Sequence, residues 1–105
     1  MKKLLLGLAF ASSCLMAADG AAIYKKCIAC HGVNGERVAP GTKGDVKIGG
    51  KPKDYLVEQL KGYAAGTADN GGAKAIMYAN MKAFKLTDAD IEAVADYISK
   101  LPPAQ

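Results

Sequence analysis

Residues 27–31 read CIACH: two cysteines three positions apart, followed directly by His31, the only histidine in the 105-residue chain. This spacing is typical of three different sites, which are a redox-active dithiol, half of a zinc site, and a covalent attachment point for haem. Each site needs different surroundings. The rest of the sequence therefore has to decide among them.

The N-terminus has the pattern of a secretory signal. Two lysines precede an apolar run over residues 4–16, which is too short to span a bilayer comfortably, and small residues follow it. We therefore predict a signal peptide over residues 1–18 and a single domain over residues 19–105, located in the periplasm. A second interpretation is a lipoprotein signal that acylates Cys14, although Ala11 stands where such signals usually carry Leu.

The expected mature chain is small and nearly neutral. Its 87 residues can form only a thin apolar core, so something further should stabilise the domain. A bridge between Cys27 and Cys30 would close too short a loop to restrict the unfolded chain much, whereas a large buried cofactor would stabilise more. With 12 basic and 10 acidic residues its net charge is +2, which does not indicate nucleic-acid binding.

Hydrophobic periodicity predicts a helix at the start of the domain. This helix would begin at Asp19, a good N-cap, and continue through the cysteines. Ile23, Cys27 and Cys30 recur at intervals of four and three, so both sulfurs would leave one helix face. Residues 32–52 are crowded with glycine and interrupted by proline, which predicts a loop.

Two further helices are expected. One follows Pro52, places Leu56 and Leu60 on one face and ends near Gly66, after which a glycine-rich segment leads toward the methionines. The last has Thr87 as its N-cap. Its apolar stripe consists of Ile91, Val94, Ala95, Ile98 and Leu101. The sequence thus predicts an all-α fold of three to five helices with long loops.

These surroundings favour haem attachment. A structural zinc site usually has four Cys or His ligands, and the mature chain offers only three. A thioredoxin-like dithiol would be expected beside a βαβ pattern, which is absent, although the spacing alone does not exclude it. Haem needs export, a helix that presents both sulfurs, an adjacent imidazole and an apolar pocket. We therefore predict that Cys27 and Cys30 bind one haem c through two thioethers, with His31 as an iron ligand.

The sixth position of the iron decides the function. It could be open, hydrated or filled by a side chain, and Met77 and Met81 are the methionines of the expected mature chain. A thioether ligand would favour ferrous iron and raise the reduction potential. Spacing alone does not choose between the two. An open position would instead suit a module that binds a diatomic gas or peroxide.

Three stretches together resemble the small bacterial monohaem class I cytochromes c. They are DGAAIYKKCIACHG at 19–32, KAIMYANMK at 74–82 and LTDADIEAVADYISKLP at 86–102. The resemblance implies a periplasmic electron carrier of the class I cytochrome c fold, whose first and last helices cross beside the haem. The close-crossing positions would be Gly20, Tyr24 and Tyr97.

The same resemblance implies Met77 as the axial ligand, because AIM at 75–77 matches the family pattern and Met81 falls where an aliphatic core residue is common. The segment before the last helix is slightly longer than usual, so Met81 remains an alternative. Pro40 would correspond to the residue whose carbonyl fixes the proximal imidazole.

The expected function is one-electron shuttling between respiratory redox partners. Such a monomer would transform no small-molecule substrate, would bind no nucleic acid and would not be an enzyme. Basic residues gather around and after the CIACH motif: Lys25, Lys26, Lys43, Lys47, Lys51 and Lys53. Acidic residues gather in the last helix: Asp88, Asp90, Glu92 and Asp96. This asymmetry predicts an acidic docking face on the partner, a membrane-bound oxidase or another redox protein.

Overall fold

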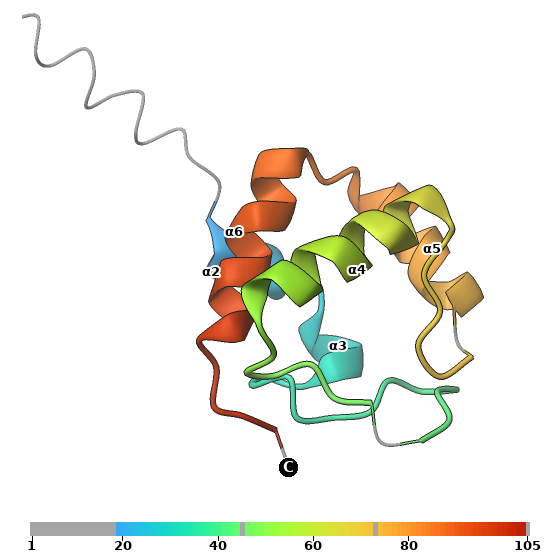
Figure 1. Cartoon of the computed structure of the whole chain (residues 1–105), viewed down its shortest axis with the longest axis horizontal. Helices are drawn as coiled ribbons and strands as arrows, with labels where there is room; N and C mark the ends of the chain where they lie inside the picture. The colour runs from blue at the N-terminus through green and yellow to red at the C-terminus, as the bar shows by residue number, and fades with distance from the viewer. Residues whose placement is uncertain (1–18, 45, 73, 105) are drawn as a thin grey trace, which may run out of the picture.

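The structure is a computed structural model that describes residues 19–44, 46–72 and 74–104 (Figure 1). Within these ranges it contains no strand and five helices: α2 (Gly20–Tyr24), α3 (Ile28–His31), α4 (Lys53–Ala65), α5 (Lys74–Phe84) and α6 (Asp88–Ser99). The predicted all-α class is confirmed. The expected signal peptide and Cys14 lie outside the described residues. No described helix has the length and apolar character required to span a membrane.

The N-terminal helix predicted to run from Asp19 through the cysteines is divided into two. The Asp19 carboxylate accepts hydrogen bonds from the main-chain N–H groups of Ala21 and Ala22, at 3.1 and 3.3 Å, and so caps α2. After Tyr24 the chain closes shorter i to i+3 bonds, including Cys27 N–H to the Tyr24 carbonyl at 2.8 Å, before α3 begins. The prediction of a single continuous helix is therefore wrong. The spacing of the apolar residues is the same for this tight turn as for an α-helical turn, so it could not reveal the break.

The later helices follow local signals closely. Helix α4 ends at Gly66, which adopts a left-handed conformation with φ of 80° that suits glycine. Thr87 caps α6 in a reciprocal capping box, with Asp90 N–H to Thr87 Oγ1 at 3.1 Å and Thr87 N–H to Asp90 Oδ2 at 2.9 Å. Both predictions are confirmed. Helix α5 was not predicted; it occupies the segment that carries both methionines.

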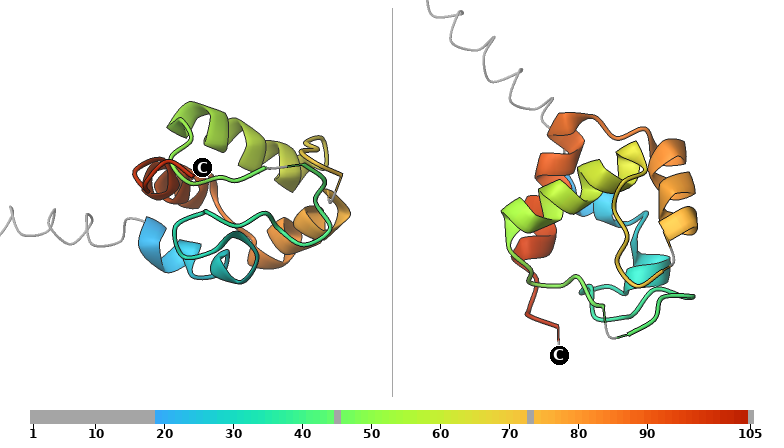
Figure 2. Two further views of the ribbon diagram at one scale, coloured as in Figure 1. Left: turned by 90° about the horizontal axis from the view of Figure 1, so that it is seen from below. Right: turned by 45° about the vertical axis from the view of Figure 1, so that its right-hand side comes forward.

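The core forms where α2 and α4 pack on α6, and α5 packs on α4 (Figures 1 and 2). It consists of Tyr24, Leu56, Val94, Ala95 and Ile98. The rings of Tyr24 and Tyr97 lie 5.5 Å apart between centroids where α2 crosses α6. At this crossing Gly20 leaves no room for a side chain, because a Cβ there would overlap the Ala93 carbonyl oxygen and lie 3.0 Å from the Tyr97 Cβ.

Gly20→Ala is therefore expected to destabilise the folded protein. Although alanine favours helix formation over glycine, its methyl group would force α2 and α6 apart, an overpacking effect that typically costs about 1–3 kcal/mol. Denaturant unfolding of the mature protein measures the change. Ala22→Ser, on an exposed position of the same helix, is the control and should remain close to wild type. An unchanged unfolding midpoint for Gly20→Ala would contradict the tight crossing.

Candidate functional site

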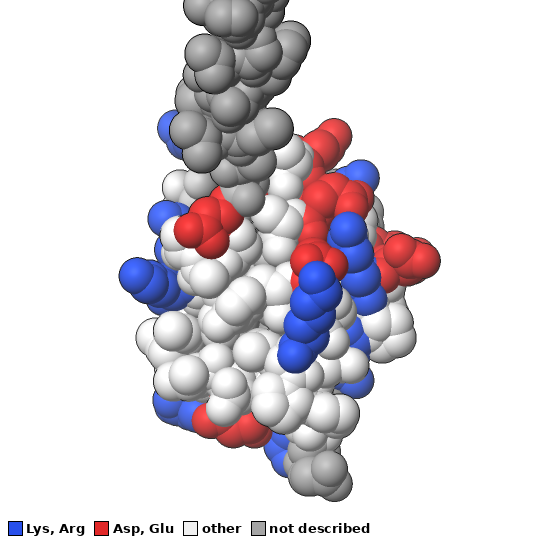
Figure 3. Space-filling view, turned by 90° about the vertical axis from the view of Figure 1, so that its left-hand side faces the viewer, with Lys and Arg blue, Asp and Glu red and all other residues white. Residues whose placement is uncertain are grey.

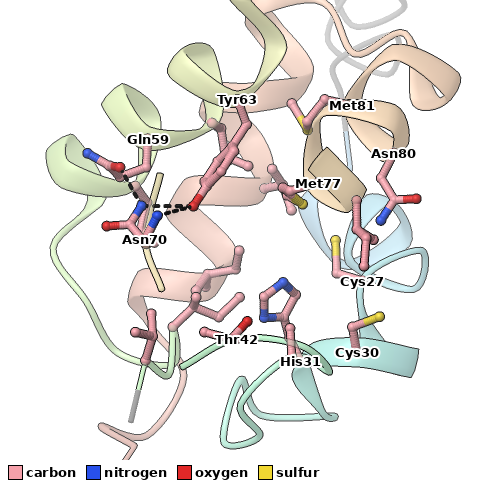
Figure 4. Close-up of a pocket in the computed structure, with 18 of the residues that line it drawn as sticks. Cys27, Cys30, His31, Thr42, Gln59, Tyr63, Asn70, Met77, Asn80 and Met81 are labelled. Carbon is pink, nitrogen blue, oxygen red and sulfur yellow. Dashed lines mark hydrogen bonds between the residues drawn. The ribbon is translucent and has the colours of Figure 1, made fainter. Parts of the chain in front are cut away.

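One cavity of about 350 Å³ lies at the centre of the domain, a size typical of small-molecule and cofactor sites. Helices α3, α4, α5 and α6 and the loop after α3 all contribute to its wall. Much of that wall is apolar, including Leu56, Leu60, Ile76, Phe84, Val94 and Ile98. The four ligand candidates from the sequence, Cys27, Cys30, His31 and Met77, all line this one cavity (Figure 4).

Hydrogen bonds fix the main chain on both sides of His31. Its N–H donates to the Cys27 carbonyl at 2.9 Å, and its own carbonyl accepts from Arg37 N–H at 3.0 Å. The next carbonyl, of Gly32, accepts a buried hydrogen bond of 2.6 Å from the Tyr24 hydroxyl. Burial raises the pKa of Tyr24 to about 12, so this hydroxyl remains protonated and keeps donating. These bonds position the main chain at His31, and its ring points into the cavity (Figure 4).

The His31 ring has the properties of a metal ligand. Burial lowers its pKa, so the neutral form, which binds metals, predominates at neutral pH. Its buried Nδ1 has no hydrogen-bond partner in the part of the chain that the structure describes. Pro40 lines the same cavity, but its carbonyl does not make the hydrogen bond to Nδ1 that we predicted. In a neutral imidazole the other ring nitrogen, Nε2, can bind a metal, and such a bond would still leave Nδ1 without a hydrogen-bond partner from the described residues.

Cys27, the N-cap of α3, and Cys30, within α3, are both unpaired thiols. Burial raises the pKa of the Cys27 thiol to about 11, whereas reactive redox thiols have a lowered pKa. This argues against a thioredoxin-like dithiol. Nor do the described residues bring three or more His, Cys, Asp or Glu side chains together in a cluster that could hold a metal. A closed zinc site is therefore not formed by these residues.

The two methionines occupy different positions on α5. Met77 is half-buried and lies between Met81 and the His31 ring in the view of Figure 4. Met81 also lines the cavity, but only 4% of it is exposed and it packs as a core residue. The arrangement therefore favours Met77 over Met81 as the side chain that faces His31 across the cavity.

Sequence reasoning missed a polar cluster on the cavity wall. The Asn70 side-chain amide donates to Gln59 Oε1 at 2.7 Å and to the Tyr63 hydroxyl at 2.9 Å, and Asn70 N–H donates to the same hydroxyl at 3.0 Å (Figure 4). Gln59 and Tyr63 lie on α4, whereas Asn70 lies in the segment before α5. The Asn-Gly pair at 70–71 was the available signal, because it marks a turn.

Charges are less segregated than predicted. Lys53 of α4 forms an ion pair with Glu92 of α6 at 3.3 Å, so the acidic last helix does not lie apart from this lysine. Figure 3 shows acidic and basic side chains beside one another on the face that includes α6. Lys51 lines the cavity, and Lys43 is exposed next to the cavity residue Thr42. Of the six lysines around and after the CIACH motif, only Lys51 is among the residues that line the cavity, and Lys53 is paired with an acidic residue of the last helix.

This site fits a haem. One wall offers two thiols and a neutral imidazole, the opposite wall offers a thioether, and the space between them is largely apolar. Thiol, imidazole and thioether are the side chains that c-type haem attachment and ligation use.

Comparison with known proteins supports haem binding independently of the structure. The profile of the family described as cytochrome c matches residues 17–102. Cytochrome c-553 of Nitratidesulfovibrio vulgaris is 47% identical over 94 residues, covering 90% of this chain and 87% of that protein. Cytochrome c-553 of Helicobacter pylori strain J99 is 37% identical over 103 residues, covering 96% and 99%. A thiosulfate dehydrogenase electron acceptor of Thiomonas intermedia is 37% identical over 78 residues, covering 74% of this chain and 32% of that protein.

Proposed function

Because this chain belongs to the cytochrome c family, we propose that it is an exported one-electron carrier that holds a single haem c with His31 and Met77 as axial ligands. The observation that carries this proposal is the cavity that collects Cys27, Cys30, the only histidine and Met77. Bound there, haem would supply a one-electron ferric and ferrous couple. The family and its cytochrome c-553 relatives support electron transport rather than catalysis.

Each residue would contribute a separate part of the function. Cys27 and Cys30 would tether the cofactor, so it could not dissociate between partners. His31, fixed by its main-chain hydrogen bonds, would move little when the charge at the site changes. Met77 would present a soft sulfur that favours the reduced state. The apolar wall would exclude water and so limit solvent reorganisation.

A spectrum and a redox titration test the proposal. We expect the periplasmically matured protein to be coloured and to cycle reversibly between two forms with a one-electron Nernst slope. Both forms should be low-spin, because two strong axial ligands are retained. A high-spin ferric spectrum would instead support the open-site module for gas or peroxide, and a colourless protein would exclude haem.

The electron partner would dock near the cavity mouth. Lys51 lines the cavity, exposed Lys43 directly follows the lining residue Thr42, and exposed Ile76 adds an apolar contact on α5. Such a surface suits the brief, electrostatically steered encounters that a shuttle needs. We propose a periplasmic location and a redox partner with an acidic docking face, a membrane-bound oxidase being the leading candidate.

Lys43→Gln is expected to slow electron transfer to oxidase-containing membranes of the source organism a few-fold at low ionic strength. The effect should fade near 0.15 M salt, where the Debye length falls to about 8 Å. Lys100→Gln removes the same charge beside Asp96 on α6 and serves as the control. Equal slowing by both variants, or a rate that rises with salt, would mean that the lysine near the cavity does not steer docking.

A further inference from the structure

Helix α5, which carries Met77, depends on few elements for its position. Its principal helix partner is α4. The aromatic contact between them joins Tyr63 of α4 to Tyr78 of α5, with ring centroids 5.9 Å apart. Tyr78 directly follows Met77 in the chain. A contact that fixes the position of Tyr78 therefore also restricts the position of Met77.

The segment over residues 66–72 is bound to both helices. The Tyr78 hydroxyl donates to the Ala68 carbonyl at 2.6 Å, which ties α5 to this segment. Asn70 ties the same segment to α4 through its hydrogen bonds with Gln59 and Tyr63. A continuous path thus runs from α4 through Tyr63, Asn70 and the Ala68 carbonyl to the residue beside Met77.

Asn70 uses all of its side-chain polar groups in this path. Besides the amide bonds, its Oδ1 accepts a long hydrogen bond of 3.4 Å from the Tyr55 hydroxyl. The two amide bonds are part-buried. Removal of the Asn70 side chain would therefore cost Gln59 Oε1 its bond from this amide and would leave the Tyr63 hydroxyl with only the bond from Asn70 N–H, and water would replace these losses only in part. The cluster lines the cavity but makes no contact with His31, Cys27 or Cys30 in the hydrogen bonds of the described residues.

We propose that Asn70, Tyr63 and Tyr78 form a latch that keeps the Met77 segment closed over the cavity and so controls how easily an external ligand displaces Met77. These are positioning residues, because they act on Met77 through the main chain and not by touching the iron. The inference rests on the proposed role of Met77 as the sixth ligand. Such a latch would keep Met77 in place although α5 lies at the periphery of a small domain. The protein would then remain an electron carrier and would not become an open ligand-binding site.

The test uses imidazole as the external ligand of the ferric holoprotein. We expect Asn70→Ala to bind imidazole about tenfold faster than wild type, since breaking part-buried hydrogen bonds makes opening easier. Tyr78→Phe keeps the ring contact, removes only the hydroxyl bond to Ala68, and should show a smaller increase. Asn34→Ala is the matched control; it deletes an exposed asparagine side chain outside the latch.

Hydrogen exchange separates a local latch from general destabilisation. In Asn70→Ala the amides of α5 should exchange faster while those of α6 remain as in wild type. Equal imidazole rates in wild type and Asn70→Ala, or equal acceleration of exchange in α5 and α6, would overturn the latch. If Asn70→Ala does not fold, Tyr63→Phe and Tyr78→Phe test it by the same two measurements. A wild-type spectrum without thioether ligation would refute the role of Met77 instead, so the two failures are distinguishable.

Discussion

Replacement of both Cys27 and Cys30 by alanine should yield a protein that retains no haem after acid denaturation and is largely unfolded. Each thiol would add across one vinyl group of the cofactor, so loss of both removes every covalent link. The remaining chain would have to fold around an unfilled cavity of about 350 Å³, which a domain of this size can hardly stabilise. Mass spectrometry and far-ultraviolet circular dichroism measure the two effects.

The single variants and a neighbouring substitution complete this experiment. Cys27→Ala and Cys30→Ala should each keep one thioether, and therefore the added haem mass, at reduced yield. Ala29→Ser, at the exposed position between the cysteines, should behave as wild type. Haem that stays attached in the double variant would show that another side chain forms the link, and a wild-type protein with only the apoprotein mass would refute covalent attachment.

Helix caps and apolar stripes in the sequence predicted those helices whose position along the chain depends on neighbouring residues. Helix α6 could be predicted because Thr87 and Asp90 form its cap and its apolar stripe faces the core. Helix α5 could not, because it buries only Met81 and leaves Ile76 55% exposed, so it lacks a continuous stripe. The break after Tyr24 was missed because residues at i+3 and i+4 share the same helix face.

The candidate site could be predicted where its ligand residues are neighbours in the sequence. CIACH places three of the four ligand candidates within five residues, and the structure brings Met77 to the same cavity. The Asn70 cluster depends on how a glycine-rich turn returns to α4, and the Lys53–Glu92 ion pair depends on how α4 packs on α6. Periodicity and spacing carry no information about such contacts between segments.

Met77→Ala should change the iron environment more than any other substitution outside the CIACH motif. Loss of the thioether would open the sixth position to water or another donor, which stabilises ferric iron. We therefore expect the weak far-red charge-transfer band of the ferric protein to disappear and the reduction potential to fall by an amount on the order of 100 mV. Optical spectra and a redox titration measure both changes.

Met81→Leu is the matched control because it alters the second methionine on the same helix and the same cavity. Met81 is buried, and leucine conserves its volume and apolar character, so the free energy of unfolding should change by less than about 1.5 kcal/mol. The far-red band and the potential should both remain. If Met81→Leu removes the band while Met77→Ala preserves it, Met81 is the ligand. If neither variant changes the band, the sixth ligand is not a methionine of α5, and the thioether that faces His31 across the cavity serves only as packing.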